Sequence, residues 1–162
     1  MTPGVYNIDP ETYCYNMPIK VKRLNKNAKL PVQGSDAAAG YDVFACLDSP
    51  FIKINPHETV KVSTGIAVSP PANTWIGVFA RSGMATKLGL RPSNCTGVVD
   101  PDYRGPVIVA IHNDTDYAQT INNGDKIAQL IVMPRLTMEI EEVDELDETD
   151  RGSGGFGSTG NK

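Results

Sequence analysis

Apolar residues in this chain gather in short runs, and turn-forming residues separate most of these runs. Seven runs rich in valine, isoleucine and aromatic residues predict β-strands: 19–24, 41–45, 59–68, 74–80, 106–113, 125–132 and 136–143. Glycine, proline, asparagine or aspartate breaks most of them apart. This spacing is typical of an antiparallel sandwich or barrel rather than of βαβ units. The pattern therefore predicts an all-β fold.

One segment, "RSGMATKLGL" (81–90), reads as a helix of barely two turns. Ser82 is the expected N-cap, residues 84, 85, 87 and 88 favour a helix, and Gly89 is expected to end it. Two of the β runs, "PVIVAIHN" (106–113) and "IAQLIVMP" (127–134), are apolar on both faces. A two-sheet core needs only one apolar face, so the surplus indicates a subunit interface.

Length and composition agree with one globular domain that has a core of useful size. The chain has 162 residues, of which 40% are hydrophobic. Its net charge is −4, but eight of the nineteen acidic residues lie between Glu139 and Asp150, and we expect that run to be a solvated strand end and linker. No strongly basic stripe remains elsewhere, which argues against binding to duplex nucleic acid.

Cysteine and histidine are too few and too scattered for a zinc site or a disulfide framework. The cysteines are Cys14, Cys46 and Cys95, and the histidines are His57 and His112. This usage predicts free thiols in a reducing compartment. The N-terminus has neither a charged nor an apolar signal region, and no stretch approaches the length of a membrane span. We therefore expect a cytoplasmic protein, or one inside a host cell if it is viral, with no membrane partner.

Several polar residues lie within or between apolar runs, at positions where apolar or turn-forming residues are expected. The stretch "NCTGVVDPDYRGP" (94–106) places Asp100 and Asp102 between two apolar runs, which suits either a hairpin turn or catalysis. Asp42 and Gln129 each lie inside an apolar strand, where an unpaired polar group would cost about 1–3 kcal/mol. Arg81 precedes the expected helix, whose N–H groups attract anions.

The C-terminal segment "RGSGGFGSTG" (151–160) has the G-x-x-x-x-G spacing of a phosphate loop. A Walker A loop needs lysine where Ser158 stands, a strand before it and a helix after it. None of these is present in the sequence, because an acidic run precedes the segment and two residues follow it. From composition alone, a disordered tail is the alternative.

Five stretches in this order resemble the five motifs of the homotrimeric deoxyuridine triphosphate nucleotidohydrolases, the dUTPases. They are "AGYD" (39–42), "RSGMA" (81–85), "GVVDPDYRG" (97–105), "GDKIAQL" (124–130) and "RGSGGFGSTG" (151–160). The resemblance implies a jelly-roll-like β-barrel with one short helix, a homotrimer with shared active sites, and Mg²⁺-dependent hydrolysis of dUTP to dUMP and pyrophosphate. That reaction limits uracil incorporation into DNA and supplies dUMP for dTMP synthesis. The tail would be a flexible arm that closes over nucleotide on another subunit.

The resemblance also implies roles for individual residues in the reaction. Asp100 matches the carboxylate that deprotonates the water attacking the α-phosphorus, and Gln129 matches the residue that helps to fix this water and meets the phosphates. Asp42 matches the carboxylate that orients water ligands of Mg²⁺, which often uses few protein ligands. Matches to phosphate-binding residues are Arg81, Ser82, Gly83, Arg151, Ser158 and Thr159. Matches to the uracil and deoxyribose site are Asn94, Gly97, Val98, Val99, Tyr103 and Phe156.

The matched motifs divide the chain into three parts. Residues 1–17 precede the match as an extension of unknown role, 18–143 would form the catalytic barrel, and 144–162 the acidic linker and arm. Pro101 lacks an N–H that the hairpin could use for base recognition. Two alternatives stay open: a dCTP deaminase of the same fold, although "RSGMA" has no glutamate, and a regulatory protein-binding member of the family.

Overall fold

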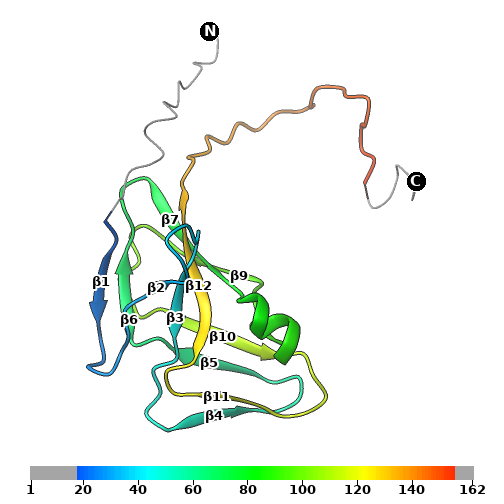
Figure 1. Cartoon of the computed structure of the whole chain (residues 1–162). Helices are drawn as coiled ribbons and strands as arrows, with labels where there is room; N and C mark the ends of the chain where they lie inside the picture. The colour runs from blue at the N-terminus through cyan, green and yellow to red at the C-terminus, as the bar shows by residue number, and fades with distance from the viewer. Residues whose placement is uncertain (1–17, 156–162) are drawn as a thin grey trace.

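The computed structural model describes residues 18–155, and nearly all of its regular structure is β (Figure 1). The strands are β1 (Lys20–Arg23), β2 (Val32–Gln33), β3 (Tyr41–Phe44), β4 (Phe51–Ile54), β5 (Thr59–Ser63), β6 (Ile66–Ser69), β7 (Thr74–Phe79), β8 (Leu90–Pro92), β9 (Thr96–Val99), β10 (Ile108–Asn113), β11 (Gln119–Asn122) and β12 (Lys126–Pro134). One short π-helical turn, η2 (Met84–Leu88), follows β7. The all-β prediction is confirmed.

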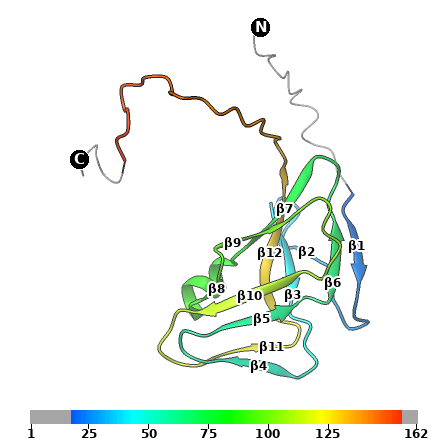
Figure 2. The ribbon, with the colours of Figure 1, turned by 180° about the vertical axis from the view of Figure 1, so that it is seen from behind.

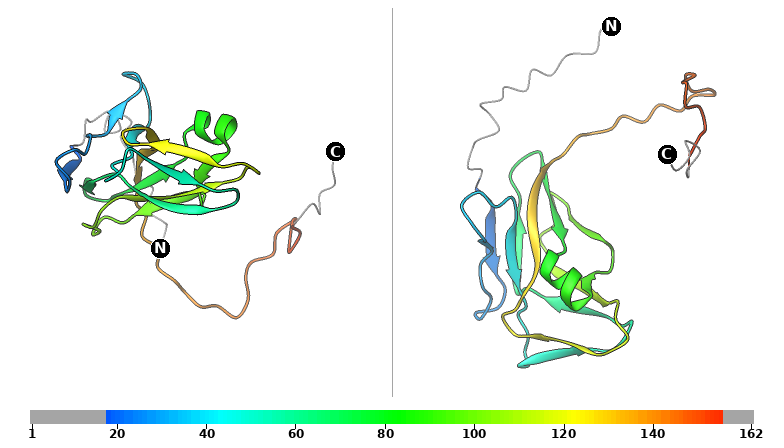
Figure 3. Two further views of the ribbon diagram at one scale, coloured as in Figure 1. Left: turned by 90° about the horizontal axis from the view of Figure 1, so that it is seen from below. Right: turned by 45° about the vertical axis from the view of Figure 1, so that its right-hand side comes forward.

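The strands pair antiparallel in four sheets. The largest has the order β2-β3-β12-β7-β9, and the next has the order β5-β10-β8. Two smaller pairs, β1-β6 and β11-β4, complete the body (Figure 2). Over residues 18–155 these sheets are separate hydrogen-bonded units and not one closed barrel. Seen from below, η2 projects from one side of the strands (Figure 3).

The core lies between the sheets and is built largely from isoleucine and valine. Strand β10 shows the expected alternation, because Val109, Ile111 and Asn113 are buried while Ile108 faces solvent. Asn113 is fully buried, and its amide donates to the carbonyls of Ile54, Asn55 and Tyr117. These bonds satisfy an otherwise costly buried group and hold the loop after β10 in place.

The predicted strand over 59–68 is two strands, β5 and β6, with a sharp turn between them. Gly65 makes this turn with a φ of 68°, in the left-handed region. A Cβ at Gly65 would lie 2.7 Å from the sulfur of Cys46, so the turn needs both the conformation and the small size of glycine. The chain therefore leaves β5, which pairs with β10, and joins β1 through β6.

The prediction of a strand over 136–143 is wrong for the single chain. After β12 ends at Pro134, the chain leaves the body as an extended segment without strand structure (Figure 1). Leu136, Met138 and Ile140 are 84–89% exposed, because nothing in residues 18–155 pairs with this segment or covers it. Alternating apolar positions indicate a strand only where a neighbouring strand exists.

The helix ends as predicted but begins differently. Gly89 has a φ of 61°, and its N–H donates to the carbonyl of Met84, so it is the predicted C-cap. The expected Ser82 cap is wrong: Gly83 occupies the N-cap position and no side chain caps the helix. Within residues 18–155, no helix is long and apolar enough to cross a membrane.

Candidate functional site

Strand β12 lies between β3 and β7 and brings three motifs to one place. Across these strands, Gln129 is paired with Asp42 on one side and with Phe79 on the other. Asp42, whose side chain is 12% exposed, accepts from Nε of Arg81 at 2.8 Å through Oδ1. Its other oxygen, Oδ2, lies 2.8 Å from Nζ of Lys126. One carboxylate between two cations leaves this cluster with a net positive charge, which suits an anionic ligand.

Lys126 is a site residue that sequence reasoning did not identify. The pairing of β12 with β3 shifts register between Lys126 and Ala128, which is a β-bulge. Because of the bulge, Lys126 stands opposite Phe44 and faces the same side of the sheet as Asp42. Ile127 and Ala128 are both buried, as a break in the alternation requires. The lysine in "GDKIAQL" was the only sequence signal, and strict alternation would have placed it on the other face.

Gln129 has a structural partner for its amide. Its Nε2 donates to the carbonyl of Ala80 at 3.0 Å, and the side chain is partly buried. A Cβ at Gly40 would lie 2.6 Å from Oε1 of Gln129, so this glycine leaves room for the amide. The packing of Gly40 and the bond to Ala80 together fix the direction of the amide oxygen.

The predicted phosphate segment lies beside this cluster. Ser82 and Gly83 are exposed at the start of η2, and a Cβ at Gly83 would meet nothing. Arg81 and Lys126 also line a pocket of about 340 Å³, together with Thr120 and Asp125. Its remaining lining is apolar: Met84, Leu88, Leu90 and Ile121.

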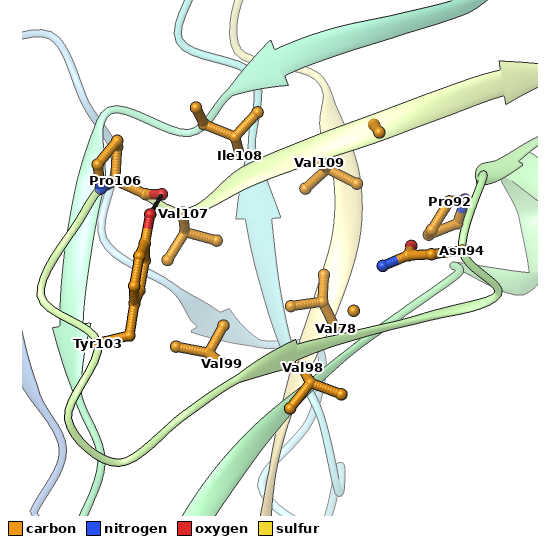
Figure 4. A pocket seen from close by; sticks show the side chains of 12 residues that line it. Val78, Pro92, Asn94, Val98, Val99, Tyr103, Pro106, Val107, Ile108 and Val109 are labelled. Atoms are coloured by element: carbon orange, nitrogen blue, oxygen red, sulfur yellow. Dashed lines mark hydrogen bonds between the residues drawn. The ribbon is translucent and has the colours of Figure 1, made fainter.

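A second pocket, of about 220 Å³, lies on the other side of β7, between β9 and β10 (Figure 4). Its lining includes all five predicted base and sugar residues of the described chain: Asn94, Gly97, Val98, Val99 and Tyr103. The hydroxyl of Tyr103 donates to the carbonyl of Pro106 at 3.1 Å, which holds the ring against one wall. A Cβ at Gly105 would collide with this phenol. The walls are mostly valine and proline, so the pocket suits a flat, weakly polar ring.

Asp100 is exposed at the end of β9, beside this second pocket. The carbonyl of Asp100 accepts from the N–H of Tyr103 at 3.2 Å, which makes the turn that the Asp-Pro-Asp sequence predicted. Arg104 donates to the carbonyls of Pro101 and Tyr103 and closes the same turn. The turn geometry and an exposed carboxylate are thus both present.

Asp100 and Gln129 of one chain do not meet. Strand register places Val99 level with Ile76 and Val132, whereas Gln129 is level with Phe79. Asp100 is one residue further along than Val99, so at about 3.3 Å per residue and about 4.8 Å per strand it lies about 13 Å from Gln129 along the strands and about 10 Å from it across them. Two groups that share one water molecule lie within hydrogen-bond reach of it, so these two residues cannot share one within a single chain.

Of the four predicted site residues in the arm, one lies among the described residues. Arg151 is exposed on the extended C-terminal segment, and its Nε donates to the carbonyl of Gly154 at 2.9 Å. Phe156, Ser158 and Thr159 lie outside the described residues. The structure therefore brings together the first four motifs as two half-sites and leaves Arg151 apart from both.

Comparison with known proteins gives one consistent result. The family model described as dUTPase matches residues 26–160. The deoxyuridine 5'-triphosphate nucleotidohydrolase of Hydrogenobaculum is 42% identical over 146 residues, covering 90% of this chain and 100% of the relative. The enzyme of that name from Coxiella burnetii is 41% identical over 126 residues, covering 77% and 82%.

Solved structures of dUTPases also resemble this fold. The dUTPase of Staphylococcus bacteriophage 80alpha with dUPNHPP superposes with a TM-score of 0.79 at 30% identity, covering 88% of this chain and 98% of that one. A mutant dUTPase from phage phi11 of S. aureus, described as showing the coordination of a structural Mg(II) ion, has a TM-score of 0.72 at 27% identity, covering 81% and 99%.

Proposed function

The chain belongs to the dUTPase family, and from this membership we propose that it hydrolyses dUTP to dUMP and pyrophosphate, with Asp100 as the general base and Mg²⁺ as the cofactor. The observation that carries this proposal is the pair of half-sites. One is a narrow apolar pocket beside an exposed carboxylate, and the other is a cationic cluster beside a short helix. Together they suit the base and the phosphates of one nucleotide.

The pocket between β9 and β10 is proposed to hold uracil and deoxyribose. Valine side chains would cover the flat faces of the base, and Asn94 with the backbone near Gly97 would provide polar partners. The ring of Tyr103, held by its bond to Pro106, would lie under the sugar and leave no room for a 2′-hydroxyl. Selection for deoxyuridine would then come from shape at the sugar and hydrogen bonds at the base.

The cluster on β12 is proposed to hold the phosphates. Among the described residues, Arg81 donates only through its Nε, to Asp42. Its terminal nitrogens are therefore available to an anion. Ser82 and Gly83 add exposed donors at the start of η2. Charge that builds on the phosphate oxygens during attack would be stabilised by these fixed donors.

Asp42 is the residue that we propose to meet Mg²⁺, through water. Residues 18–155 hold no group of three or more metal-ligating side chains, but Mg²⁺ is commonly held by one or two carboxylates and by substrate phosphates. Asp42 is a single partly buried carboxylate beside the proposed phosphate site, so its placement fits that mode. When bound, the ion would neutralise phosphate charge and orient the triphosphate.

A complete site requires more than one copy of the chain. Because Asp100 and Gln129 lie far apart within one chain, we propose that Asp100 of one copy meets Gln129 of another. A closed homotrimer supplies three such sites. We further propose that residues 144–162 form the arm of the site, with Arg151, Ser158 and Thr159 on the outer phosphates and Phe156 on the uracil. The body from residue 18 to 143 would be the catalytic domain.

One assay tests the proposed reaction against its alternatives. The purified protein is incubated with dUTP, dCTP and dTTP in the presence of Mg²⁺, and pyrophosphate and ammonia are measured. We expect pyrophosphate from dUTP alone. Ammonia from dCTP would indicate a deaminase, and the absence of both products would indicate a binding protein. Repeating the dUTP reaction in EDTA tests the Mg²⁺ requirement.

A further inference from the structure

Two arginine–aspartate pairs in this protein differ in a way that concerns the phosphate site. Arg91 binds Asp114 through two parallel bonds, Nε to Oδ2 at 2.7 Å and Nη2 to Oδ1 at 3.0 Å. Arg81 binds Asp42 through Nε alone, at 2.8 Å. The two-bond arrangement is the preferred geometry of a guanidinium with a carboxylate. Something therefore keeps Arg81 from adopting it.

Lys126 accounts for the difference. Its Nζ lies 2.8 Å from Oδ2 of Asp42, the oxygen that a second bond from Arg81 would use. Among the described residues, Asp114 has no lysine partner. Its Oδ1 accepts from Arg91 at 3.0 Å and has only a longer contact, 3.5 Å, with Nε2 of His112. The β-bulge in β12 is what brings Lys126 to the side of the sheet that carries Asp42. The bulge thus places Lys126 so that its Nζ occupies Oδ2 of Asp42.

We propose that Lys126 is a positioning residue that occupies Oδ2 of Asp42 and so leaves the terminal nitrogens of Arg81 available to the phosphates. Without Lys126, Asp42 would capture Arg81 in a two-bond pair like that of Arg91 with Asp114. A captured guanidinium would meet an anion with fewer free donors and with its charge neutralised at close range. This inference rests on the proposed function, in which Arg81 binds phosphate.

The test measures binding of a non-hydrolysable dUTP analogue by calorimetry in EDTA, so that any role of Asp42 toward a metal ion does not enter. Lys126→Met keeps the aliphatic stem and removes the donor. We expect its affinity to fall about tenfold to a hundredfold, the range of one charge-assisted hydrogen bond. Lys126→Arg retains a cationic donor for Oδ2 and should bind within a few-fold of the unmodified protein. Lys22→Met, on exposed β1, is the matched control for loss of one lysine.

A double variant separates positioning from direct contact. In Lys126→Met with Asp42→Asn, the asparagine keeps Oδ1 as an acceptor but has no second oxygen to capture Arg81. Asp42→Asn by itself removes a negative charge beside the anion and should tighten binding somewhat in the unmodified protein. We therefore expect the same change to tighten binding of the analogue more in Lys126→Met than in the unmodified protein. Thermal melting of each variant shows that the fold is retained.

Two results would overturn the inference: unchanged affinity in Lys126→Met, or an Asp42→Asn change that tightens binding no more in Lys126→Met than in the unmodified protein. The second result would mean that Lys126 contacts the ligand itself. Arg81→Met separates this failure from failure of the proposed function. If Arg81→Met binds the analogue as tightly as the unmodified protein, the phosphate role of Arg81 is wrong. If its binding is weakened while Lys126→Met binds normally, only the role of Lys126 is wrong.

Discussion

Asp100 is exposed at the end of β9, where we propose that its carboxylate takes a proton from a water molecule beside the pocket between β9 and β10. Asp100→Asn keeps the shape of the side chain and removes the base, so nucleotide should still bind while kcat falls by about 10² to 10⁴. Steady-state rates with dUTP and calorimetry with a non-hydrolysable analogue measure the two effects. A variant with nearly unmodified kcat would contradict the assignment of the base.

Gly105 is a second residue whose role follows from a close contact. A Cβ at this position would collide with the phenol of Tyr103, an exposed side chain that can move, so Gly105→Ala should displace the ring without unfolding the protein. A pocket of this kind can favour dUTP over UTP by a factor of roughly 10⁴ in kcat/KM. We expect this factor to fall at least about tenfold in Gly105→Ala. The ratio of kcat/KM for dUTP and UTP measures this change. Gly34→Ala, whose Cβ meets nothing, is the control, and an equal loss in both variants would exclude a specific contact.

At the scale of elements, the described part of the C-terminal segment after β12 contributes nothing to the core. Arg135 to Asp150 are exposed along their whole length. Truncation after Asp150 should therefore leave the melting temperature unchanged, since the described part of the removed segment, 151–155, buries no apolar side chain. It should lower kcat/KM for dUTP by about a hundredfold, because the contacts that we propose for Arg151 and the residues after it, with the phosphates and the base, would be lost. A truncated protein that melts early would make the segment structural, and one with full activity would remove it from the site.

At the scale of the whole molecule, the separation of Asp100 from Gln129 predicts sites shared between copies, which the proposed trimer would supply. Light scattering should give about three times the chain mass of 17.5 kDa. Copies carrying Asp100→Asn and copies carrying Gln129→Ala should each be inactive alone. After they are mixed and reassembled in equal amounts, about one quarter of the sites would combine an intact Asp100 with an intact Gln129, so activity should return. Absence of any recovery in verified mixed trimers would contradict the shared site.

The sequence alone identified the elements whose signals are local. Most of the longer strands were predicted from their apolar residues, and Gly89 was predicted to end the helix, because period and turn chemistry depend on a few neighbouring residues. Strands β2, β4, β8, β9 and β11 were not identified. Each has two to four residues, as few as the predicted strands β1, β3 and β6, and β8, β9 and β11 also contain a turn-forming proline, glycine or asparagine. The family motifs were also recognised from the sequence, because each motif is a short run of residues and their order along the chain needs no structure.

Tertiary structure decided what depends on pairing between distant segments. A bulge relative to β3 placed Lys126 beside Asp42, although the alternation within β12 by itself points it away. Strand register separated Asp100 from Gln129, two residues that the motifs had assigned to one water molecule. The apolar alternation over 136–143 predicted a strand, but a strand requires a neighbour, and the single chain offers none among its described residues. In each case the sequence states which face of a segment is apolar, whereas the partner and the register come from contacts between residues far apart along the chain.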